Sequence, residues 1–124
     1  MKTSDVARLK AHELRKLLDR REVSSVEITE AMLDRIEEVE HKVNSYVTVT
    51  QELALDQAAR ADERIAVGDV RPLTGVPMQI KDNMCTRGVV TTCSSKMLEK
   101  FIPPYDATVY QRLQNDGAVL LGKG

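Results

Sequence analysis

Lys81 is the residue of this sequence whose position best suits chemistry. It ends the short apolar run VPMQI and is followed at once by Asp82 and Asn83. A lysine acts as a general base only when its pKa falls from about 10.4 toward neutrality, and burial lowers it because desolvation disfavours the ammonium. Strand alternation places Lys81 on the face opposite Ile80. Spacing alone favours a lysine that reaches the surface at a strand end, and it leaves the base open as an alternative.

A phosphate-binding loop is suggested by the last eight residues, GAVLLGKG. Gly117, Gly122 and Lys123 have the spacing G-x-x-x-x-G-K, but Gly124 stands where the motif needs a magnesium-binding Ser or Thr. The four intervening residues resemble a strand, whereas the motif needs a loop that aims backbone N–H groups at phosphates. We interpret the match as a coincidence.

The histidines and cysteines do not have the spacing of a metal site. His12 and His41 lie on separate predicted helices, and Cys85 and Cys93 are eight residues apart, so no metal is expected. Cys85 could act as a nucleophile after a strand, although a packed thiol is the preferred interpretation. So few cysteines fit a reducing compartment, and we expect a cytoplasmic protein.

The composition indicates a globular chain without the charge pattern of nucleic-acid or membrane binding. The 124 residues are 42% apolar and 30% charged, with 18 basic and 19 acidic side chains. Such a chain can bury an aliphatic core, and it suits one domain or a piece of a larger one. No stretch approaches the length of a signal peptide's apolar core or a membrane span.

The first part, residues 1–68, is predicted to be mainly helical. Leu14, Leu17 and Leu18 form an apolar stripe in residues 3–22, joined by Val6 and Leu9. Ser24 and Glu27 have the spacing of a capping box at the start of a second helix. Its expected buried face recurs at three- and four-residue steps, at Ile28, Met32, Ile36, Val39 and Val43. A short strand or extended link follows at 45–49, and then a helix that ends at Gly68.

The second part, residues 69–124, is predicted to be α/β. A strand is expected at 76–80, then Gly88 with a second β-branched run, and a short helix within SSKMLEK. Asp106 is expected to cap a helix that Gly117 ends, and residues 118–121 form an apolar strand. Helix, glycine and apolar strand are typical of a parallel-sheet unit. The last strand should be buried on both faces, yet no helix follows it to cover the sheet.

The stretches LTGVPMQIKDNMCTRGVVTTCSSKML, PPYDATV and GAVLLGKG resemble the N-terminal portion of the amidase signature family. The core G-V-P-M-Q-I-K-D-N carries the general family pattern. The combination of TTCSSKML with PPYDATV is most similar to the branch that provides the A-type subunits of glutamyl-tRNA(Gln) amidotransferases. The resemblance implies a mixed, mainly parallel amidase-type sheet, preceded by helices and incomplete at the C-terminus, in residues 1–124 as part of one amidase domain.

The family resemblance implies a Ser-Ser-Lys mechanism in which Lys81 is the base. Its amine would take a proton from the nucleophilic serine through the middle serine and return it to the leaving ammonia. Asp82 and Asn83 are expected to shape the turn. No Gly-Gly-Ser-Ser run is present, and residues 93–95 (CSS) lack the glycines of an oxyanion hole. Both serines and the substrate-binding residues are therefore expected beyond residue 124, and this chain is expected to be inactive alone.

The same resemblance implies partners and cofactors. Glutamine would be the substrate, and the ammonia would reach a different subunit of an expected heterotrimer. That partner would amidate Glu-tRNA(Gln) with ATP and magnesium, so that this chain binds no cofactor and meets tRNA only indirectly. Two alternatives are an amidase of the same family that hydrolyses a free amide, and a non-enzymatic module that binds a partner through an exposed sheet face.

Overall fold

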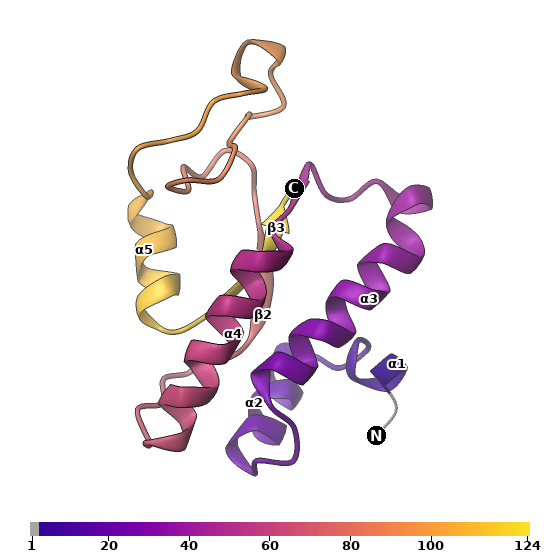
Figure 1. Cartoon of the computed structure of the whole chain (residues 1–124), viewed down its shortest axis with the longest axis vertical. Coiled ribbons are helices and arrows are strands. Elements are labelled where there is room, and N and C mark those ends of the chain that lie inside the picture. Colours follow the sequence, from indigo (N-terminus) through magenta and orange to yellow (C-terminus); the bar gives the residue numbers. More distant parts are fainter. Residues whose placement is uncertain (1–2) are drawn as a thin grey trace.

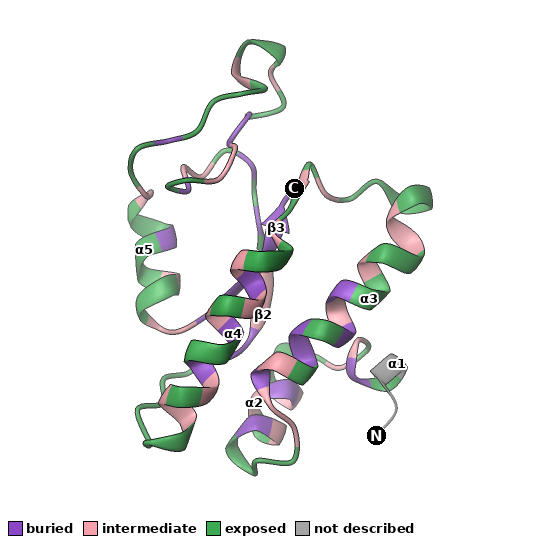
Figure 2. Ribbon diagram, in the orientation of Figure 1, coloured by how far each residue is buried: buried purple, intermediate pink, exposed green. Residues whose placement is uncertain are grey.

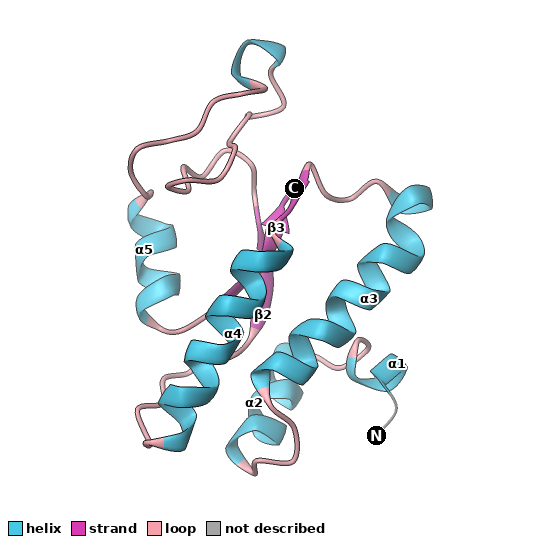
Figure 3. Ribbon diagram, viewed as in Figure 1, coloured by secondary structure: helices cyan, strands magenta, loops and turns pink. Residues whose placement is uncertain are grey.

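A three-stranded sheet forms the centre of the molecule, with helices on both of its sides (Figure 1; Figure 3). The computed structural model describes residues 3–124, with side chains from residue 5 onward. Within these residues, no helix combines the length and the apolar character needed to cross a membrane. The helices are α1 (Thr3–Val6), α2 (Ala11–Asp19), α3 (Ser25–Val43), α4 (Gln51–Ala66), the 3₁₀ turn η1 (Lys96–Leu98) and α5 (Thr108–Asn115); the strands are β1 (Thr48–Val49), β2 (Pro77–Ile80) and β3 (Val119–Lys123).

The start of α3 has the predicted capping box. The Ser24 hydroxyl accepts from the Glu27 N–H at 3.1 Å, and the Glu27 carboxylate accepts from the Ser24 N–H at 2.8 Å. These hydrogen bonds lower the pKa of Glu27, since they favour its charged form. Gly68, with φ of 80°, follows the end of α4 as predicted.

The predicted stripe in residues 3–22 is confirmed, since Val6, Leu14 and Leu18 are buried in one cluster with Leu9 packed against it. The chain turns between Ala7 and Lys10, so these residues form two helices.

One prediction for the helical half needs correction. The periodicity of α3 predicts a buried Val43, yet 59% of this residue is exposed. The last turns of α3 are mostly exposed (Figure 2), whereas Ile28, one end of the same stripe, is fully buried. Helical periodicity therefore predicts the face of a helix but does not show how far its neighbours extend.

β3 is the central strand, in the order β1-β3-β2. It is antiparallel to β1 and parallel to β2, with Ile80 opposite Lys123. Val119 and Leu121 pack with alanines of α4, and Leu120 packs with Ile80 and with Tyr110 of α5. Both faces of β3 are thus covered by helices that precede it in the chain. The prediction that this strand is buried on both faces is therefore confirmed, and the helices that cover it come before it in the chain.

A long loop joins β2 to α5 and lies over the carboxyl ends of β2 and β3 (Figure 1). Its β-branched run forms no strand, and η1 confirms the predicted short helix. The prediction that Asp106 caps α5 is wrong, because Ala107 occupies that position. The Asp106 carboxylate accepts instead from the Arg87 N–H at 2.7 Å, so this side chain closes the loop rather than the helix.

Gly122 is required by the close approach of β1 to β3. A Cβ added there would lie 2.7 Å from Cδ1 of Tyr46 and would overlap the Thr48 carbonyl. We expect Gly122→Ala to reduce the free energy of unfolding by about 1–3 kcal/mol, as overpacking does. Thermal or urea unfolding measures this loss.

Hydrogen exchange locates the effect of Gly122→Ala. The amides of Val47 and Thr50 donate to carbonyls of β3 and should exchange faster than the rest of the core. Gly68→Ala is the matched control, because Gly68 has a positive φ but no atom within 4 Å of an added Cβ. Equal protection of these two amides in both variants would contradict the steric explanation.

Candidate functional site

Lys81 follows β2 directly and is exposed in this structure. Gln79, on the same face of the strand, is also exposed, and Ile80 on the other face is buried. Alternation therefore predicts the two faces correctly. The expectation from spacing, that Lys81 reaches the surface at the strand end, is confirmed for these residues, because β2 is an edge strand and nothing among residues 3–124 covers the outer side of Lys81.

The turn that begins at Lys81 is tied to the end of β3 by backbone hydrogen bonds. The Met84 N–H donates to the Lys81 carbonyl at 3.1 Å, which closes the turn. The Asp82 N–H donates to the Gly124 carbonyl at 2.6 Å, and the Gly124 N–H donates to the Ile80 carbonyl at 3.0 Å. These bonds continue the parallel pairing of β2 and β3 by one residue, so the position of Lys81 depends on that of β3.

Asp82 points inward and holds the far side of the loop. One of its carboxylate oxygens accepts from the Thr92 N–H at 3.0 Å and from the Thr92 hydroxyl at 2.5 Å. Its carbonyl accepts from the Cys93 N–H at 2.8 Å. The predicted side-chain-to-backbone bond of Asp82 is present, but it reaches Thr92 across the loop, and the turn itself is closed by the backbone bond from Met84 to Lys81. The neighbouring Asn83 is exposed.

The lysine that the structure buries is Lys123, which is 0% exposed. Its Nζ donates to the Met84 carbonyl at 2.8 Å, to Thr91 Oγ1 at 3.0 Å and to Thr86 Oγ1 at 3.1 Å. Its Nζ also lies 3.6 Å from Oδ1 of Asp82. That oxygen is buried and receives no hydrogen bond within the part of the chain that the structure describes. The positive charge of Lys123 therefore compensates for the missing hydrogen bond to this oxygen.

The three acceptors around Lys123 indicate an ammonium. The Thr86 hydroxyl donates to the Met84 carbonyl, and the Thr91 hydroxyl donates to the Val89 carbonyl. Each hydroxyl therefore offers Lys123 a lone pair. An ammonium has three donors for three acceptors, whereas a neutral amine has two. Burial lowers the pKa of Lys123, and the nearby Asp82 carboxylate opposes that fall.

Sequence reasoning missed Lys123, although a signal was present. The runs VPMQIK and AVLLGK both place a lysine after an apolar strand. Only the pairing of the strands shows that β3 is central and β2 is at the edge. The prediction that the G-x-x-x-x-G-K spacing is a coincidence agrees with the structure, since Gly122 and Lys123 lie within β3.

The remaining candidate residues are not assembled into a second site within residues 3–124. His12 and His41 are exposed on α2 and α3. Cys85 is half-buried, and its thiol donates to the Tyr105 hydroxyl at 3.4 Å. That contact raises the pKa of Tyr105.

Residues 93–95 form a turn in which Cys93 and Ser94 have positive φ angles of 50° and 56°. The Ser94 N–H is already bonded to the Thr92 hydroxyl at 3.1 Å. This N–H is therefore not free to stabilise an oxyanion. The result agrees with the prediction that CSS does not form an oxyanion hole.

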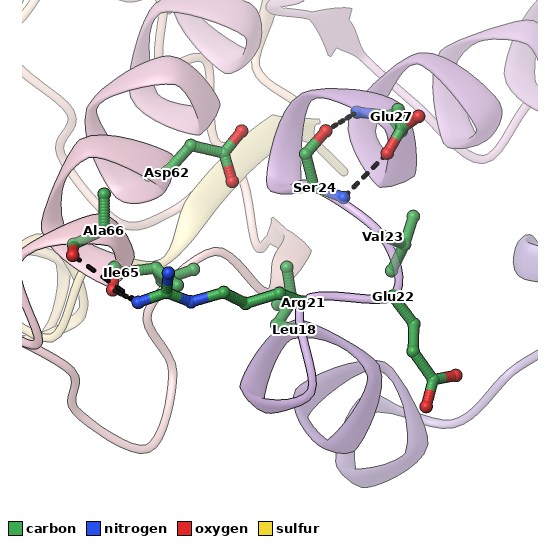
Figure 4. Close-up of a pocket in the computed structure, with 9 residues that line it drawn as sticks. All are labelled: Leu18, Arg21, Glu22, Val23, Ser24, Glu27, Asp62, Ile65 and Ala66. Atoms are coloured by element: carbon green, nitrogen blue, oxygen red, sulfur yellow. Dashed lines mark hydrogen bonds between the residues drawn. The ribbon is translucent and has the colours of Figure 1, made fainter.

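Pockets lie both beside this turn and away from it. One of about 310 Å³ adjoins it and is lined by Thr92, Ser94 and Ser95 together with residues of the β1 segment. Another of about 490 Å³ lies between the α2–α3 junction and the end of α4 (Figure 4). Its polar groups already have structural partners: Arg21 donates to the carbonyls of Ile65 and Ala66 at 3.4 and 3.5 Å, which caps α4.

The sequence model of the Amidase family matches residues 27–124. Two curated relatives are A-type subunits of glutamyl-tRNA(Gln) amidotransferases, from Desulfosudis oleivorans at 55% identity and from Geotalea daltonii at 59%. Each alignment covers 93% of this chain and 24% of the relative, so the chain spans about a quarter of their length.

Solved structures with a similar arrangement include amidases. The native peptide amidase from Stenotrophomonas maltophilia has a TM-score of 0.87 at 30% identity, and the match covers 94% of this chain and 24% of the peptide amidase. An amidase family protein from Bacillus anthracis has a TM-score of 0.88 at 30% identity, and the match covers 98% of this chain and 25% of that protein.

The ion pair between Lys123 and Asp82 predicts that substitutions at two neighbouring residues differ strongly in their effect on stability. Asp82→Ala leaves the Lys123 charge buried without its carboxylate, and we expect a loss of about 3–5 kcal/mol in the free energy of unfolding. Asn83→Ala removes an exposed side chain and should change that free energy by less than about 0.5 kcal/mol. Urea unfolding of both variants at neutral pH measures the difference. Similar stabilities for the two variants would show that the pair contributes little.

Proposed function

Because the chain belongs to the Amidase family, we propose that its residues form the N-terminal part of the glutamine-hydrolysing subunit of a Glu-tRNA(Gln) amidotransferase. The observation that carries this proposal is the 55–59% identity to the amidotransferase proteins over 93% of the chain. The peptide amidase reaches 30% over a similar span. This difference favours a tRNA-linked glutaminase over an amidase that acts on free peptides.

In the proposed mechanism, Lys81 is the base. A serine attacks the carboxamide carbon of glutamine, and its proton passes through the middle serine to the Lys81 amine. Collapse of the tetrahedral intermediate breaks the C–N bond, and the proton returns to the leaving ammonia. Water then hydrolyses the glutamyl ester to give glutamate. Both serines come from outside residues 1–124, so the chain alone should not hydrolyse glutamine.

The position of Lys81 supports this role. It stands at the carboxyl end of a parallel strand, where active sites of α/β sheets are usually found. Its outer side is open, so residues that follow in a longer chain can reach it. Those residues would exclude water from the amine and favour its neutral form, which a base requires.

The ammonia would be used by a partner protein of the same complex. We propose that this partner amidates Glu-tRNA(Gln) with ATP and magnesium, while the present chain contacts neither cofactor. The near-balanced charge of the chain, 18 basic against 19 acidic residues, suits a component that does not itself bind tRNA.

The base assignment can be tested in a joined protein. Residues 1–124 replace the corresponding quarter of the Geotalea daltonii relative, to which they are 59% identical, and the product is assembled with the partner subunits of that relative. Lys81→Ala should lower kcat for glutamine hydrolysis by about 10²–10⁴-fold, the usual contribution of general acid–base catalysis. Ammonia release measures the rate.

The matched control for Lys81→Ala is Lys100→Ala, which removes another exposed lysine of the same part of the chain and should leave kcat unchanged. Retained activity in Lys81→Ala would contradict the assignment. A folded, assembled joined protein that never hydrolyses glutamine would contradict the proposed function, as would glutaminase activity of residues 1–124 alone.

A further inference from the structure

Lys123 contacts several parts of the loop that follows Lys81. Its ammonium reaches the Met84 carbonyl within the turn itself and the hydroxyls of Thr86 and Thr91 further along. Its backbone belongs to the central strand, where it lies opposite Ile80. One side chain therefore joins the centre of the sheet to the turn that carries the proposed base.

The contact to Met84 bears directly on Lys81. Met84 closes the turn by donating its N–H to the Lys81 carbonyl at 3.1 Å, and its own carbonyl accepts from Lys123 at 2.8 Å. The peptide units on both sides of Met84 are thus fixed, one to Lys81 and the other to β3. Without the ammonium, the Met84 carbonyl would keep only the Thr86 hydroxyl, at 3.2 Å.

The ion pair with Asp82 has a second consequence. Asp82 is the sequence neighbour of Lys81, and a free carboxylate there would attract the Lys81 amine and favour its charged form. In the structure this carboxylate faces inward, with Thr92 bound to one oxygen and Lys123 lying 3.6 Å from the other. Lys123 thus pairs with the Asp82 carboxylate, which is the acidic group nearest to Lys81 in the sequence.

We propose that Lys123 is a positioning residue for Lys81. Its ammonium holds the Met84 carbonyl and the Asp82 carboxylate, which fixes the turn from which Lys81 projects and keeps the carboxylate away from the Lys81 amine. The inference rests on the proposed role of Lys81 as the base. Lys123 itself has no open path to a substrate, because it is fully buried and its three donors are occupied.

The test uses the joined protein and four variants. Lys123→Met removes the ammonium at similar side-chain length, and Thr91→Val removes one acceptor while keeping the side-chain shape. Thr91→Val provides a milder change should Lys123→Met not fold. Lys81→Ala reports on the base, and Lys100→Met is the control for loss of an exposed lysine.

Hydrogen exchange by mass spectrometry gives a readout that needs no activity. In Lys123→Met, peptides covering residues 82–95 should exchange about tenfold faster or more relative to peptides of α3, since the loop opens locally. Thr91→Val should give a smaller change in the same peptides, and Lys100→Met should give none. An equal increase in all peptides, or no increase, would overturn the proposal.

Kinetics provide the second readout. Lys123→Met should lower kcat for glutamine hydrolysis by about tenfold or more with little change in KM, because a misplaced base affects the transition state more than substrate binding. An unchanged kcat would overturn the positioning role. If Lys81→Ala stays active, the assignment of Lys81 as the base fails instead, and the exchange result still decides whether Lys123 holds the turn.

Discussion

The ammonium of Lys123 is placed where a buried charge is costly, and the surrounding residues satisfy it fully. Three oxygen acceptors lie at 2.8–3.1 Å, and a buried carboxylate lies at 3.6 Å. A buried ion pair stabilises a protein only when its geometry and remaining hydrogen bonds are good. The loop from Met84 to Thr91 has to wrap around this group, and the position of Lys81 follows from that loop.

Lys123 lies inside this loop because it is the last residue of the central strand β3. β3 is covered on one face by α4 and on the other by α5, and its parallel pairing with β2 sets Lys123 opposite Ile80. The open edge of β2 leaves Lys81 exposed only one residue further on. Two lysines at the ends of neighbouring strands therefore have opposite environments. One can hold the structure, and the other can meet a substrate.

Local sequence signals predict most of the elements. The capping box at Ser24, the glycine after α4 and the apolar run of β3 each depend on nearby residues, and each is confirmed. Predictions that depend on tertiary neighbours are less successful. Val43 extends beyond its packing partners, and Asp106 bonds to a distant loop residue rather than to α5.

The candidate site shows the same division. The motif around Lys81 predicts the family and a side-chain-to-backbone bond at Asp82, because both depend on residues adjacent in the sequence. The partner of Asp82 is 41 positions away along the chain and could not be predicted without the order of the strands. Burial of a strand-end lysine depends on whether its strand is central. The apolar run AVLL predicts a strand buried on both faces, but only the order of the strands shows which lysine the loop encloses.

Lysine-selective ¹⁵N NMR at neutral pH tests the central claim most directly, because it reports the protonation of each side-chain nitrogen. Among the lysines that the structure describes, one ammonium signal should be protected from exchange with water, and this signal should be lost in Lys123→Met. Rapid exchange of every lysine ammonium, a neutral amine at Lys123, or a protected signal that persists in Lys123→Met would contradict the account.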